Sequence, residues 1–187
     1  MTKMTPQNAS EVFPQYAVMG FLYLHPMHGY DLHKQLQAHL GEIWHIRQSQ
    51  AYSIMKRLEK EGMISATRQP QPKRPDRELL TLTDGGRQAF ETWLACPTPT
   101  SARALRVEFL TRIFFASQIN SETCSRLIRE QIEATRKDLA ELEKHLASVL
   151  PDQVFNRMGL ELRVRQSYTM MEWLESCESA LSFSGTK

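Results

Sequence analysis

Basic side chains gather in one short stretch of the chain, residues 47–77. The stretch holds eight Lys and Arg residues against three Asp and Glu residues, a balance of +5, whereas the whole 187-residue chain carries a formal net charge of +2. Lysine and arginine neutralise the phosphates of nucleic acid and release the counterions condensed there, which supplies affinity without sequence preference. The stretch therefore indicates a DNA-binding face, and a solvated basic helix is the alternative.

Two further features of this stretch are typical of DNA recognition. A recognition helix reaches base edges and phosphates with the residues near its N-terminus. Small polar residues stand at that place here: Gln48, Ser49, Gln50 and Ser53. Farther on, three prolines within residues 70–75 exclude a helix and predict a stiff turn that carries Lys73 and Arg74.

The predicted elements around these residues change from helix to strand. Apolar spacing predicts three helices, over residues 16–24, 30–40 and from 49 onward. Gly41 is expected to end the second helix, Ser49 to cap the start of the third, and Gly62 to end it. Residues 63–68 and 78–83 then predict short strands with Ile64, Leu80 and Leu82 facing inward, and Thr83 or Asp84 would cap a fourth helix. This order predicts a winged helix-turn-helix domain over residues 12–95.

The second half of the chain shows no strand signal. A Pro- and Thr-rich stretch at 96–101 predicts a linker, followed by helices over residues 103–117, 121–150 and 153–181. The middle helix has a heptad seam, and the last helix has an apolar, aromatic and sulfur-rich stripe. We expect both to join two copies of the chain, with a ligand pocket as the alternative for the stripe. The expected dimerisation residues are Ile128, Ile132, Leu139, Leu142, Leu146, Val149, Tyr168, Met171 and Leu174. The predicted fold is thus mainly α with a small β-wing, with a helical dimerisation domain over residues 102–183.

Composition and motifs narrow the function further. Hydrophobic residues make up 41% and charged residues 24%, an ordinary globular balance. Three scattered cysteines without a C-x-x-C pair argue against a disulfide framework or a zinc ribbon and predict a cytoplasmic protein. We find no signal peptide, no apolar run long enough to span a bilayer, and no catalytic or phosphate-loop motif. Neither enzyme activity nor a cofactor is expected.

Five of the six histidines fall within residues 25–45, which raises the alternative of a metal-responsive sensor. A metal site needs two or three ligands on one face. His28 and His33 are five residues apart, a poor helical pairing, and His39 and His45 lie on either side of Gly41. We therefore expect packing and surface roles for these histidines and no bound metal, and keep the sensor as the alternative function.

Several blocks of sequence resemble the PadR family of transcriptional regulators. They are AVMGFL at 17–22, PMHGYDL at 26–32, SQAY at 49–52, MKRLEKEGMI at 55–64 and LTDGGR at 82–87, in the family's order and spacing. In the second half, Glu108-Phe109 and Trp173-Leu174-Glu175 resemble the longer subfamily, which has an all-helical C-terminal dimerisation domain. The wing differs from the family pattern because it is Pro-rich and lacks the usual glycine.

The resemblance implies a homodimeric repressor that binds pseudo-palindromic double-stranded DNA and is released by a small molecule. Some longer members respond to phenolic acids, so an aromatic effector is expected. By position, the DNA-facing residues are Ser49, Gln50, Tyr52, Ser53, Lys56 and Arg57 in the third helix and Lys73, Arg74 and Arg77 in the wing. Among these, Ser49 and Tyr52 would hold phosphates, and Gln50 and Ser53 would contact base edges.

Overall fold

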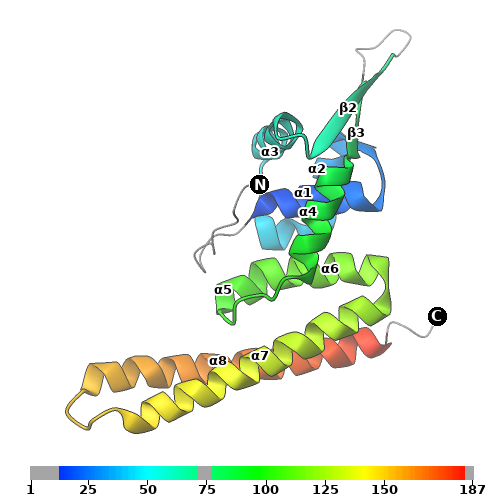
Figure 1. Cartoon of the computed structure of the whole chain (residues 1–187). Coiled ribbons are helices and arrows are strands. Elements are labelled where there is room, and N and C mark those ends of the chain that lie inside the picture. Colours follow the sequence, from blue (N-terminus) through cyan, green and yellow to red (C-terminus); the bar gives the residue numbers. More distant parts are fainter. Residues whose placement is uncertain (1–12, 71–76, 184–187) are drawn as a thin grey trace.

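The computed structural model describes residues 13–70 and 77–183 of the chain. Its first half is a small helical domain with a three-stranded antiparallel sheet of order β1-β3-β2 (Figure 1). The elements are α1 (Pro14–Leu24), β1 (Met27–His28), α2 (Gly29–Trp44), α3 (Gln48–Lys60), β2 (Ile64–Gln69), β3 (Arg77–Leu82) and α4 (Asp84–Ala95). This is the predicted winged helix-turn-helix, and the predicted fold class is confirmed.

The second half is entirely helical among the residues described. A short start at α5 (Ala102–Ala104) passes through a π-helical turn, Leu105–Phe109, into α6 (Leu110–Ile119). The long helices α7 (Ser121–Ser148) and α8 (Val154–Phe183) then form an antiparallel hairpin, and α6 lies between this hairpin and the winged-helix domain (Figure 1).

One hydrophobic core runs through both halves of the chain. The helix α1 is apolar on every side, and its residues 17–22 are all buried. Phe115 of α6 packs edge-on against Phe21 of α1 and Phe90 of α4, with ring centroids 5.2 and 5.6 Å apart. The core therefore continues past the Pro- and Thr-rich stretch at 96–101 into α6 and α7.

The heptad seam of α7 lies inside the subunit. Ile128, Ile132, Leu139 and Leu142 are 1–8% exposed in the single chain, and α7 packs along α8 of the same chain. Leu174 of α8 is fully buried as well. These five side chains are thus not available to a second copy, which corrects their expected place at the subunit interface. Leu146, Val149 and Met171 are half-buried, and Tyr168 is exposed.

Two local expectations also need correction, and one element was not expected. Gly41 does not end the second helix, which continues to Trp44 and ends at His45 with a left-handed backbone, φ 44°. Ser49 does not cap the third helix, because that helix begins one residue earlier and its N-cap is Arg47. The two-residue strand β1 pairs with Leu79 and Leu80 of β3 and was not expected. By contrast, Thr83 caps α4 as predicted, and its side chain accepts from the Gly86 amide.

Candidate nucleic-acid interface

The turn between α2 and α3 is fixed by hydrogen bonds to one backbone carbonyl. The Ile46 carbonyl accepts from Gln37 Nε2 at 2.8 Å and lies 3.2 Å from His33 Nε2, both side chains coming from α2. The Ile46 side chain is itself buried. These contacts hold the start of α3 at a set angle to α2, as a helix-turn-helix requires.

Gly29 allows α2 and α3 to approach closely. A Cβ atom at Gly29 would lie 3.2 Å from Tyr52 Cε1 and 3.3 Å from Met55 Sδ. A side chain at this position would therefore push against the inner edge of α3. The glycine brings the start of α2 to the same surface as Tyr52.

The third helix has one buried and one exposed face. Ala51, Met55 and Leu58 pack into the core. The opposite face exposes all six residues that were expected to face DNA: Ser49, Gln50, Tyr52, Ser53, Lys56 and Arg57. Burial of the first face therefore orients the polar and basic face outward.

Two of these polar side chains already have a partner inside the helix, which limits what they can offer to a base. Gln50 Oε1 accepts from the Arg47 amide at 2.9 Å, so the Gln50 NH₂ group remains as a donor. Ser53 Oγ donates to the Ser49 carbonyl at 2.9 Å, so its lone pairs remain as acceptors. Farther along α3, Arg57 lies 3.3 Å from Gln15 Oε1 and 3.9 Å from Glu61.

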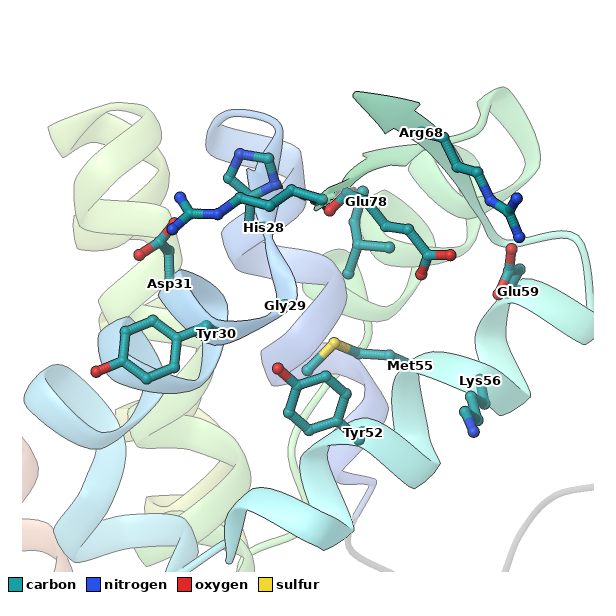
Figure 2. Close-up of a pocket in the computed structure, with 12 residues that line it drawn as sticks. His28, Gly29, Tyr30, Asp31, Tyr52, Met55, Lys56, Glu59, Arg68 and Glu78 are labelled. Atoms are coloured by element: carbon teal, nitrogen blue, oxygen red, sulfur yellow. Dashed lines mark hydrogen bonds between the residues drawn. The ribbon is translucent and has the colours of Figure 1, made fainter. Parts of the chain in front are cut away.

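A cleft of about 740 Å³ lies between α3, the start of α2 and the strands of the wing (Figure 2). Tyr30 and Tyr52 stand on either side of Gly29 in this view, and Tyr30 is 63% exposed. The walls carry as many carboxylates as cations: Asp31, Glu59 and Glu78 beside Lys56, Arg68 and Arg77. The cleft therefore carries no excess of positive charge from these six side chains.

Two family models match the chain in succession. Residues 18–92 match the transcriptional regulator PadR-like family, and residues 105–182 match the C-terminal region named virulence activator alpha. The chain belongs to the PadR-like family of transcriptional regulators. The resemblance found in the sequence is confirmed, and membership in a family of regulators agrees with the expectation that the chain is not an enzyme.

The matched relatives of this PadR-like regulator include a bacterial repressor. The chain is 28% identical over 171 residues to the negative transcriptional regulator PadR of Bacillus subtilis, covering 87% of this chain and 93% of that protein. A crystal structure of B. subtilis PadR in complex with operator DNA is 26% identical, with a TM-score of 0.43, covering 89% and 98% of the two chains. Another, in complex with p-coumaric acid, is 24% identical, with a TM-score of 0.40, covering 96% and 99%.

The wing of this PadR-like regulator is a six-residue antiparallel ladder that runs from Ile64 opposite Leu82 to Gln69 opposite Arg77. Arg77 is exposed at its outer end. Lys73 and Arg74, which were expected to contact DNA, lie outside the described residues. Tyr30 and Arg68 also line the cleft beside α3. Arg68 is one of the eight bases of the 47–77 stretch, but neither residue was among those expected to contact DNA, although Tyr30 directly follows Gly29 in the HGYD block.

The histidine cluster of this PadR-like regulator is dispersed in the structure. His28 Nδ1 lies 3.0 Å from the Glu78 carbonyl, His33 contacts Ile46, and the ring of His39 packs against Phe21 and Phe114. Within residues 13–70 and 77–183, no group of three or more His, Cys, Asp or Glu side chains could hold a metal ion. The geometry gives the metal-sensor alternative no support.

Proposed function

We propose that the protein is a dimeric, sequence-specific repressor that binds double-stranded DNA through α3 and acts in the cytoplasm. The observation that supports this best is the outward face of α3, which is polar at its start and basic farther on and is fixed in place by its buried face. The B. subtilis relative is named a negative regulator, which favours repression. The three free cysteines of the present chain agree with a reducing compartment.

The proposed contacts divide by chemistry. The Gln50 NH₂ donor suits an acceptor on a base edge, such as N7 or O6 of guanine or N7 of adenine, and Ser53 suits a base-edge donor. Ser49 and Tyr52 would hold phosphates, as would Lys56 and Arg57. The basic wing residues Lys73, Arg74 and Arg77 would follow the backbone or enter the minor groove beside it.

A free apolar stripe on α8 supports a dimer. Phe155, Met158 and Leu162 follow one another at i, i+3 and i+7 and are 87%, 59% and 58% exposed. They lie on the side of α8 opposite Leu160 and Leu174, which are buried against the rest of the chain. We propose that a second copy covers this stripe and that Leu146 and Val149 lie near it. Tyr168 and Met171 contact their own subunit instead, because Tyr168 donates a hydrogen bond to Glu143 of α7 and Met171 packs against the core. The two α3 helices would then contact half-sites about one DNA turn, ~34 Å, apart.

We further propose that a small-molecule effector, expected to be aromatic, releases the protein from its operator. Such a ligand can shift the equilibrium only as far as it binds the released state more tightly than the DNA-bound state. p-Coumaric acid, which is bound in a structure of B. subtilis PadR, is the first compound to test.

The deciding experiment is selection of genomic DNA fragments by the purified full-length protein, followed by affinity measurements over a range of salt concentrations. We expect a pseudo-palindromic site. Lys56→Ala with Arg57→Ala should weaken binding to all duplexes and reduce the slope of log K against log salt by about 1–2. The control, Lys137→Ala with Lys144→Ala, removes the same charge from exposed positions of α7. Equal binding by both double variants would show that α3 does not enter the groove.

A further inference from the structure

Buried N–H donors without an acceptor gather at the joint between α4 and α6. Arg112 of α6 is 3% exposed, and its Nη2 pairs with Glu108, but its Nε and Nη1 have no hydrogen-bond partner among the described residues. The indole Nε1 of Trp93, in the last turn of α4, has none within that part of the chain either. The Arg112 guanidinium lies over the Trp93 ring, 4.9 Å from its centroid. Because a buried unpaired donor costs free energy, this place suits an added acceptor.

Cys96 stands beside these donors. It follows α4 directly, and its backbone amide donates to the Trp93 carbonyl at 3.2 Å. Burial lowers the pKa of Arg112, and negative charge on Glu108 and Cys96 opposes this shift. Burial likewise raises the pKa of Tyr16, which stacks on the Trp93 ring, and Cys96 adds to that rise. The thiol is therefore within electrostatic range of both the guanidinium and the phenol.

The three cysteines differ in their access to solvent. Cys96 is exposed, whereas Cys124 is 4% exposed and Cys177 is half-buried. Burial raises the pKa of both Cys124 and Cys177. The thiolate is the form that reacts with oxidants, so burial makes these two thiols slow to react. An oxidant in solution should therefore reach Cys96 first.

We propose that Cys96 is a site of oxidation by a hydroperoxide and that the N–H donors of Arg112 and Trp93 hold the oxidised form. The Cys96 thiolate attacks one peroxide oxygen, so an S–O bond forms, the O–O bond breaks and the sulfur loses an electron pair. The departing hydroxide or alkoxide takes the proton of the new sulfenic acid and leaves as water or an alcohol. The sulfenate oxygen then accepts from the unpaired N–H groups. This proposal needs no DNA and is independent of the proposed function.

The first test identifies the oxidised residue. The reduced full-length protein is treated with stoichiometric hydrogen peroxide, and sulfenates are trapped with dimedone and located by peptide mass spectrometry. We expect the adduct at Cys96 before any at Cys124 or Cys177. Cys124→Ser with Cys177→Ser should keep the adduct, and Cys96→Ser should lose it. An adduct that forms first at Cys177, or none at Cys96, overturns the proposal.

The melting temperature distinguishes a held sulfenate from damage to an exposed thiol. The added oxygen gives an acceptor to buried donors, so oxidation should raise the melting temperature of the native protein by about 2–4 °C. Cys96→Ser should show no such rise after the same treatment. A melting temperature that is unchanged or lower after oxidation at Cys96 would show that the donors do not hold the product.

The donors are tested through the lifetime of the sulfenate, measured by delayed addition of dimedone. Arg112→Lys keeps a cation beside Glu108 but removes the unpaired Nε and Nη1 groups, and should shorten the lifetime about tenfold. Trp93→Phe keeps a ring without the indole N–H, should also shorten it, and decides if Arg112→Lys does not fold. Thr111→Val removes the acceptor of Trp44 one residue away and controls for lost stability, with the native lifetime expected. Native lifetimes in the Arg112 and Trp93 variants would overturn the proposal.

Discussion

Trp44 Nε1 donates a hydrogen bond of 2.9 Å to Thr111 Oγ1, which joins the last turn of the helix before the recognition helix to α6. Thr111 is fully buried and its hydroxyl also donates to the Val107 carbonyl at 2.6 Å. The helix-turn-helix is therefore attached directly to the C-terminal half, and not only through residues 96–101.

Thr111→Val should lower the free energy of unfolding by about 1–2 kcal/mol, because it leaves the Trp44 indole N–H without its acceptor. Thr111→Ser keeps the hydroxyl and is the control, with a smaller loss due to the missing methyl group. Urea denaturation of the two variants measures the difference. Equal losses in Val and Ser variants would assign the effect to packing and not to the hydrogen bond.

Gly20→Ala should destabilise the protein by about 1–3 kcal/mol through overpacking. The Phe115 ring of α6 packs directly against the backbone of α1 at Gly20. A Cβ atom at Gly20 would lie 2.4 Å from two atoms of this ring. Gly159→Ala is the control, since a Cβ there meets nothing within 4 Å, and it should stabilise α8 by about 0.5–1 kcal/mol. Combining Gly20→Ala with Phe115→Leu should cost less than the sum of the two single changes, and strict additivity would argue against the clash.

Gln50→Glu tests the assignment of a base-reading donor. The substituted carboxylate can still accept from the Arg47 amide, as Gln50 Oε1 does, but it has no N–H to offer to a base. We expect the free energy of binding to the specific site to weaken by about 1–3 kcal/mol more than that of non-specific binding, so that the ratio of the two affinities falls. Thermal stability should change little. Gln48→Glu adds the same charge at a neighbouring exposed position and should change both affinities together. A preserved ratio in Gln50→Glu would move base recognition to other residues.

Charge on the free stripe of α8 should separate the subunits without unfolding them. Phe155→Glu with Met158→Glu is expected to give a folded monomer in analytical ultracentrifugation, because both side chains are exposed in the single chain. Leu142→Glu buries a charge inside the hairpin and should unfold the C-terminal half. Asn156→Glu, on the same turn but off the stripe, is the control. A dimer that survives the double change would place the interface elsewhere.

Stability should decline at strongly alkaline pH. Burial raises the pKa of Tyr16, and burial together with the hydrogen bond to Glu91 raises the pKa of Tyr23. Above the ordinary tyrosine pKa of about 10, the unfolded chain therefore binds fewer protons than the folded one, so the free energy of unfolding falls as pH rises. Tyr16→Phe and Tyr23→Phe should each make this decline shallower, and Tyr30→Phe at an exposed ring is the control. A decline as steep as that of the native protein would contradict the assignment.

The sequence predicted the winged-helix domain well because its signals are local. The change from helical to strand spacing after Gly62, and the inward positions of Ile64, Leu80 and Leu82, follow from periodicity and are found in the structure. The heptad seam of α7 was different, because its spacing shows that another helix packs there but not whether that helix belongs to the same chain. Tertiary packing also decided the end of α2: Gly41 has the right type for a cap, yet the helix continues to Trp44, whose indole bonds α6.

The shared core around Phe115 bears on how this protein can be divided. A cut within residues 96–101 would separate two stretches that each match a family model, but it would also expose the aromatic surface of α1 and α4 that α6 covers. We therefore expect melting to occur in one cooperative transition and an isolated 12–95 fragment to aggregate. The smallest portable DNA-binding unit of this chain would then extend to the end of α6, so a chimaera that exchanges sensor regions between such regulators should be joined at residue 120.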